Sequence, residues 1–227
     1  MTMILQEIRP DESWIGGDGA LGNAAALVPE DMPESALTLL RGSPATTPQW
    51  AVRPDVAWVV EQGLDAAAAL RGMFPDQRFV PHVQASRAAV RFGLGERYAG
   101  EGFRVYVPDT AALRGYQVDD GDMPLTDWLH KADSLGFDTV WLTGSDIAAE
   151  GKGLDLELLD RGRRHFTGNL ILSGGGVELR HLESLRAEGG CFGVIVPTTL
   201  LALHGADTLC SVLNPPVEPD GTDGVAA

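Results

Sequence analysis

The sequence predicts a single (β/α)8 barrel over residues 1–213, followed by a polar tail, 214–227, that we expect to be flexible. Three observations predict this fold. The chain has 227 residues, which suits one large α/β domain. Short apolar runs recur along it, with helical patterns between the later ones. These runs are apolar throughout, as a parallel sheet covered by helices on its outer face requires.

Eight runs are expected to be strands, at 3–8, 36–40, 56–60, 79–84, 103–107, 139–142, 169–172 and 193–196. Five helices are expected, at 87–99, 124–135, 154–166, 177–187 and 199–213. Glycine and proline interrupt the first quarter, so residues 1–55 are predicted to hold shortened or irregular units.

Composition excludes several classes of function. Acidic residues outnumber basic ones by 32 to 17, and a net charge of −15 repels nucleic acid. No run approaches the roughly 18 apolar residues of a membrane helix. The start lacks a signal-peptide pattern, and two cysteines without a CxxC pair argue against a zinc cluster or a disulfide scaffold. We therefore expect a cytoplasmic protein with no cofactor, no metal, and no nucleic-acid or membrane partner.

A GxGxxG pattern at Gly17, Gly19 and Gly22 is interpreted as a loop. The dinucleotide motif must directly follow a strand and open a helix, and this one does neither.

The segment LILSGGGV, 170–177, places three glycines where a buried strand ends and a helix is expected. Glycine admits close approach of the backbone and positive φ. Helix starts bind phosphate through free backbone N–H groups, so a phosphate loop and an ordinary turn are both open.

The order TVWLTGSDIAAEGKG, LILSGGGV and GVIVPTTLL, preceded by FRVYVPDTAALRGYQ, resembles the second half of the histidine-biosynthesis barrels. The segments resemble in particular the phosphoribosylformimino-aminoimidazole carboxamide ribotide isomerase branch of that family. The resemblance covers about residues 55 to 205, with specific residues from Asp109 onward.

The resemblance implies an aldose–ketose isomerisation by two carboxylates, on strands one and five. Asp109 matches the strand-five acid, although it could instead cap the following loop. Substrate-binding positions correspond to Thr143, Ser145 and Asp146. Phosphate-binding positions correspond to Ser173, Gly174, Gly175, Gly176, Thr198 and Thr199.

The chain also departs from the family pattern. Glu7 is the nearest carboxylate on strand one, and Glu61 replaces a glycine of a second phosphate site, where it would repel an anion. We therefore expect a ligand with one phosphate. The five histidines, among them His82, show no ligand spacing and are interpreted as surface or packing residues.

Two hypotheses follow. The first is a diverged sugar-phosphate isomerase-like enzyme that binds one phosphorylated metabolite and uses Asp109 as acid/base. The second is a catalytically inactive barrel that serves as a binding or assembly subunit with a protein partner. A related branch of the resembled family occurs beside genes for pterin-dependent one-carbon metabolism, and this resemblance implies a link to that metabolism as a further alternative.

Overall fold

A computed structural model describes residues 1–7, 22–25, 37–41, 56–87, 94–99, 103–108, 115–121 and 123–215. Asp109, the GxGxxG glycines before Gly22, and the tail from 216 onward lie outside the described residues.

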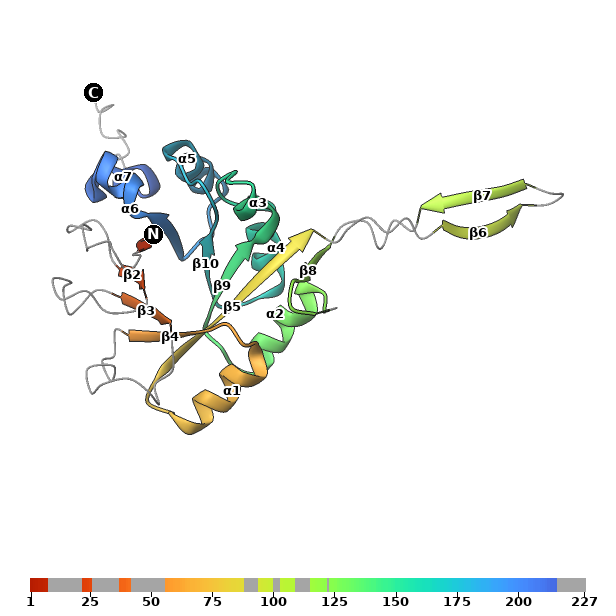
Figure 1. Cartoon of the computed structure of the whole chain (residues 1–227), viewed down its shortest axis with the longest axis horizontal. Coiled ribbons are helices and arrows are strands. Elements are labelled where there is room, and N and C mark those ends of the chain that lie inside the picture. The colour runs from red at the N-terminus through yellow and green to blue at the C-terminus, as the bar shows by residue number, and fades with distance from the viewer. Residues whose placement is uncertain are drawn as a thin grey trace, which may run out of the picture.

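Eight parallel strands close into a barrel, which confirms the predicted fold class (Figure 1). They are β1 (Met3–Glu7), β2 (Gly22–Ala25), β3 (Leu37–Arg41), β4 (Val56–Val60), β5 (Arg78–Arg87), β9 (Thr139–Gly144), β10 (Asn169–Ser173) and β11 (Gly193–Pro197). The order β4-β3-β2-β1-β11-β10-β9-β5 returns to β4, because β5 pairs with both β9 and β4.

The described helices are α1 (Leu64–Met73), α2 (Leu125–Ser134), α3 (Ser145–Ala149), α4 (Leu156–His165), α5 (Leu179–Glu188), α6 (Thr198–His204) and α7 (Ala206–Leu213). The predicted helices 124–135, 154–166 and 177–187 correspond to α2, α4 and α5. The helix predicted at 199–213 is instead two helices, because Gly205 adopts φ +75° between α6 and α7. None of the described helices is long and apolar enough to cross a membrane.

The predicted number of barrel strands, eight, is confirmed, but one barrel strand was missed and one predicted strand lies in another sheet. The second barrel strand is β2, within the glycine-rich segment where no strand was expected. The run at 103–107 is β7 (Phe103–Pro108), which pairs antiparallel with β6 (Leu94–Ala99) in a separate two-stranded sheet. The predicted helix 87–99 is also wrong, since β5 continues to Arg87 and β6 is a strand. A short apolar run does not reveal which sheet it joins. The fifth barrel strand is β5, and the run at 103–107 belongs to the separate sheet.

The alternation of side chains along the strands divides the core into two layers. Inside the barrel lies a small cluster made of Leu5, Leu39, Ala57, Val59, Val80, Trp141, Ile171 and Ile195. A larger cluster fills the space between the strands and the helices, and it includes Val83, Leu142, Leu172 and Val196. Each fully buried aliphatic side chain stabilises the fold by about 1.5–3 kcal/mol.

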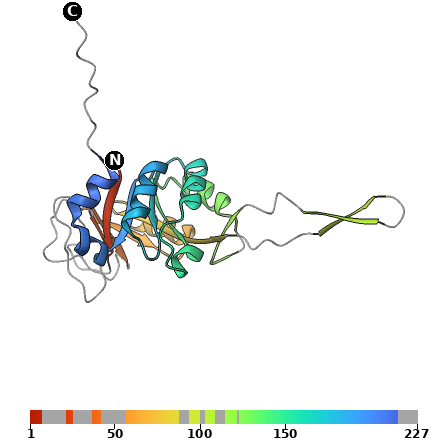
Figure 2. The same cartoon turned by 90° about the horizontal axis from the view of Figure 1, so that it is seen from above.

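The two ends of the described chain meet beside β1. Thr2 N donates to Asn214 Oδ1 at 2.7 Å, and Asn214 Nδ2 donates to Thr2 O at 2.9 Å. Figure 2 shows α6 and α7 alongside β1, where they cover the seam between the first and last barrel strands.

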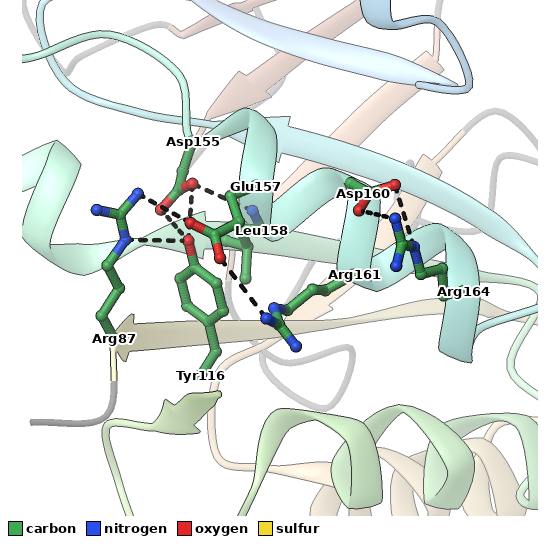
Figure 3. Close-up of polar contacts among 8 residues, drawn as sticks. All are labelled: Arg87, Tyr116, Asp155, Glu157, Leu158, Asp160, Arg161 and Arg164. Atoms are coloured by element: carbon green, nitrogen blue, oxygen red, sulfur yellow. Dashed lines mark hydrogen bonds and ion pairs between the residues drawn. The ribbon is translucent and has the colours of Figure 1, made fainter. Parts of the chain in front are cut away.

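A buried polar cluster holds the far end of β5 (Figure 3). There β8 (Tyr116–Val118) pairs antiparallel with β5, and Tyr116 Oη donates to Asp155 Oδ1 at 2.9 Å. Asp155 also caps α4 by accepting from Leu158 N at 3.1 Å. Arg87 adds a bond to Tyr116 Oη at 3.4 Å and an ion pair to Glu157 at 3.3 Å. Strand β5 is thus fixed to α4 just beyond the barrel mouth.

Candidate functional site

The carboxyl ends of the parallel strands form one face of the barrel, where barrel enzymes place their chemistry. Strand alternation turns His82 of β5, Thr143 of β9 and Ser173 of β10 toward the same interior as the inner apolar cluster. Glu61 directly follows β4 and joins them. These four side chains form a continuous polar chain across the mouth.

The chain of contacts is short at each step. His82 Nε2 lies 2.9 Å from Thr143 Oγ1, which lies 2.5 Å from Ser173 Oγ. At the other side of the ring, His82 Nδ1 lies 3.5 Å from Glu61 Oε1. Trp141 Nε1 donates to Ser173 Oγ at 2.7 Å. Both nitrogens of a buried histidine are therefore occupied by groups that accept or exchange protons.

The carboxylate of Glu61 at one end of this chain can only accept a hydrogen bond, and at the other end stands the indole of Trp141. Its N–H can only donate, so Ser173 Oγ accepts there and can pass its own hydrogen to Thr143. Thr143 can then donate to His82 Nε2, which leaves the ring proton on Nδ1 beside Glu61. The arrangement favours the Nδ1-protonated tautomer of neutral His82.

Glu61 is held as a carboxylate. The hydrogen bond from His82 lowers the pKa of Glu61 below its usual value, partial burial opposes this, and Arg41 lowers it further. Arg41 Nη1 lies 3.4 Å from Glu61 Oε1. The guanidinium carbon also lies 5.1 Å from the Trp141 ring centre, and the His82 ring lies 4.4 Å from it. Trp141 thus packs against both residues that contact the carboxylate, and its ring attracts the charge of Arg41.

A cavity of about 720 Å³ opens beside this cluster. Glu61 and His82 form part of its wall, and the remainder comes from the start of α1, from β5 and β8, and from α2. Its volume lies in the range typical of small-molecule sites. Among the described residues, no group of three or more His, Cys, Asp or Glu side chains could hold a metal ion.

The three glycines after β10 have a structural explanation. A Cβ at Gly174 would fall far inside contact with Gly153 O, and one at Gly175 would do the same with Ala148 O. At Gly176, φ is +63° and a Cβ would meet Gly151 O. The loop therefore packs main chain against main chain on the preceding β/α connection, where Gly153 N donates to Gly175 O at 2.5 Å.

The helix start that follows this loop uses its own side chains. Helix α5 begins at Leu179, two residues later than expected, and Glu178 N donates to His181 Nδ1 at 2.9 Å. Arg180 forms an ion pair with Glu178 at 2.9 Å. Phosphate binding by Ser173 and Gly174–Gly176 stays a prediction.

The other predicted site residues are divided between several environments. Thr143 belongs to the polar chain, whereas Asp146 accepts from Arg87 N at 2.9 Å at the edge of α3, which Ser145 begins. Thr198 Oγ1 donates to Glu7 O at 2.8 Å, and Thr199 is exposed. Among the predicted site residues that the structure describes, Thr143 and Ser173 contact each other.

Sequence reasoning missed His82, Arg41 and Trp141, and it treated Glu61 only as a departure from a phosphate loop. A signal was present. The inward positions of β4 and β5 alternate as Ala57, Val59 and then Glu61, and as Val80 and then His82, so each ends in a polar group at the mouth.

The family model described as "Histidine biosynthesis protein" matches residues 74–205. This match and the closed parallel barrel place the chain in that family. No curated protein matches the sequence significantly.

Proposed function

We propose that the protein is an isomerase-like enzyme that moves a proton within a small metabolite, with Glu61 and His82 as its acid/base pair. The observation that carries this proposal is the placement of His82. Its ring lies between a carboxylate and a hydroxyl chain, on the wall of the large cavity. Paired titratable groups that face a cavity are typical of acid/base catalysis.

Each member of the pair has a separate role. Arg41 and His82 both contact Glu61 Oε1, so Oε2 takes the proton from a carbon next to the substrate carbonyl. When substrate binds, the hydrogen bond of His82 Nδ1–H moves from Glu61 Oε1 to the carbonyl oxygen, where negative charge develops, and Thr143 holds the opposite ring nitrogen. Glu61 returns the proton to the former carbonyl carbon, and the hydroxyl proton of the neighbouring carbon passes through His82 to the former carbonyl oxygen, so the net reaction is an aldose–ketose type of isomerisation.

The predicted metabolite carries one phosphate. The proposed phosphate-binding groups lie at the ends of β10 and β11, which are adjacent in the sheet. They are Ser173, the three glycines that follow it, and the two threonines after β11. Asp109 remains the predicted acid/base of the fifth β/α unit and is tested alongside Glu61 below.

The test is solvent deuterium incorporation, because an isomerase of this type exchanges the transferred proton with water. Sugar monophosphates that raise the melting temperature are incubated in D2O and followed by NMR. Glu61→Gln and His82→Gln are expected to slow incorporation by about 10²–10⁴-fold while folding is kept. His130→Gln, an exposed histidine on α2, is the matched control and should leave the rate unchanged.

Asp109→Asn in the same assay separates the two mechanisms. Loss of exchange in Asp109→Asn with full exchange in Glu61→Gln would overturn the proposed pair and favour the family-type acid.

A second candidate, the catalytically inactive binding or assembly subunit, is favoured by the packing of the barrel centre. Trp141 fills the inner cluster, with Arg41 and His82 against its ring. Ligands that bind without deuterium incorporation in any variant would support this candidate instead.

A further inference from the structure

The cavity beside Glu61 and His82 has an outer end, toward the helices that surround the barrel mouth. That end lies between the start of α1 and helix α2, and its walls include Leu64, Val83 and Trp128, all buried. Met123, an apolar side chain that is 39% exposed, stands at the rim. A ring or other flat apolar group would remove this surface from water.

Most of the charged side chains that line the cavity are acidic. Three carboxylates, Glu61, Asp65 and Asp120, face the space together with one ammonium group, Lys131. Lys131 Nζ is bound to Asp65 at 2.8 Å, so its charge is already matched. Glu61 is matched by Arg41. Asp120 is exposed on the rim and forms no ion pair within the described part of the chain.

We propose that this end of the cavity binds an apolar ring that carries a cationic or neutral nitrogen group, and that it excludes phosphate. The inference rests on the proposed function, because it assigns the non-reacting end of the substrate to the cavity whose inner wall holds the acid/base pair. Asp120 pairs with the nitrogen group, and the wall formed by Leu64 and Trp128 covers the ring.

The experiment uses three probes of one shape and different charge: benzamidine, benzamide and benzoate. Binding to the full chain is followed by the side-chain N–H resonances of its five tryptophans, with inorganic phosphate as a fourth probe. Benzamidine is expected to bind about tenfold more tightly than benzoate, with benzamide between them. Its binding should shift a resonance that Trp128→Phe removes.

Variants identify the rim group. Asp120→Asn should weaken benzamidine about threefold to tenfold and leave benzamide unchanged, and Asp120→Lys should reverse the order of benzamidine and benzoate. Asp76→Asn is the matched control, because this exposed aspartate lies in the turn between α1 and β5, at the opposite end of the barrel.

Equal binding of benzamidine and benzoate, a shift of the Trp128 resonance by inorganic phosphate, or an Asp120→Lys protein with the original order would overturn the inference. None of these probes needs to react, so failure here is distinguishable from loss of deuterium incorporation, which tests the acid/base pair alone.

Discussion

The loop after β10 and the segment after β4 differ in how their sequence patterns relate to the contacts that they make in the structure. The first carries the pattern SGGG, which predicts a phosphate loop, yet its glycines pack against the main chain of residues 148–153. The second reads EQG, which argues against a phosphate, yet it places Glu61 beside a buried histidine and a cavity. Close packing can require glycine as strictly as ligand binding does, and a residue that spoils one site can belong to another.

The largest expected effect concerns the packing of the glycine loop after β10. Gly174→Ala places a methyl group against Gly153 O, which is backbone and cannot rotate away. We expect the free energy of unfolding to fall by about 3 kcal/mol, measured by urea denaturation. Gly72→Ala is the control, since a Cβ there meets nothing within 4 Å and alanine favours α1.

If Gly174→Ala were as stable as the parent, the glycines would have no packing role and the phosphate-loop interpretation would gain support.

The next effect concerns the cluster that fixes β5 beyond the mouth. Tyr116→Phe leaves the buried carboxylate of Asp155 without its bond from the phenol and should cost about 1–3 kcal/mol. Asp160→Ala, which removes a surface ion pair with Arg164 on the same helix, should stay within about 0.5 kcal/mol (Figure 3). Equal costs for the two variants in urea denaturation would contradict the assigned burial.

The hydroxyl chain gives a smaller and more specific effect. Thr143→Val keeps the branched shape of the side chain but removes the group that joins His82 Nε2 to Ser173. Deuterium incorporation should fall about tenfold, because His82 is positioned less well. Thr143→Ser keeps the hydroxyl and should restore most of the rate, an outcome that a purely apolar packing role does not predict.

The smallest effect appears only at alkaline pH. Burial raises the pKa of Tyr116 above its usual value near 10, so the folded state keeps the proton more tightly than the unfolded state does. This contribution is complete below about pH 10 and is lost as the pH rises beyond it. Urea denaturation from pH 8 to 11 should show a steeper decline for the parent protein than for Tyr116→Phe.

The fold was largely predictable from the sequence because each buried strand carries a continuous apolar run. The exceptions have physical causes. β2 contains Gly22 and Asn23 and owes its place to pairing with β1 and β3, while β7 is as apolar as a barrel strand but pairs only with β6 within the described chain. Local pattern does not encode such long-range pairing.

The site was less predictable, because its members lie far apart in the sequence and on separate strands. The family resemblance assigned Thr143 and Ser173 to the site, and the two side chains do touch. His82 was assigned to packing because no other histidine is spaced to join it, and its partners, a glutamate and a threonine, become evident only once the barrel is closed.

The most direct test of the central claim is the protonation of the His82 ring, read from nitrogen–proton correlation spectra of histidine-labelled protein. The resonance is assigned by its loss in His82→Gln. The account predicts that neutral His82 carries its proton on Nδ1, facing Glu61, with Nε2 accepting from Thr143, and that Glu61→Gln weakens this preference. A proton on Nε2 in the parent protein, unchanged in Glu61→Gln, would mean that the two residues do not form an acid/base pair.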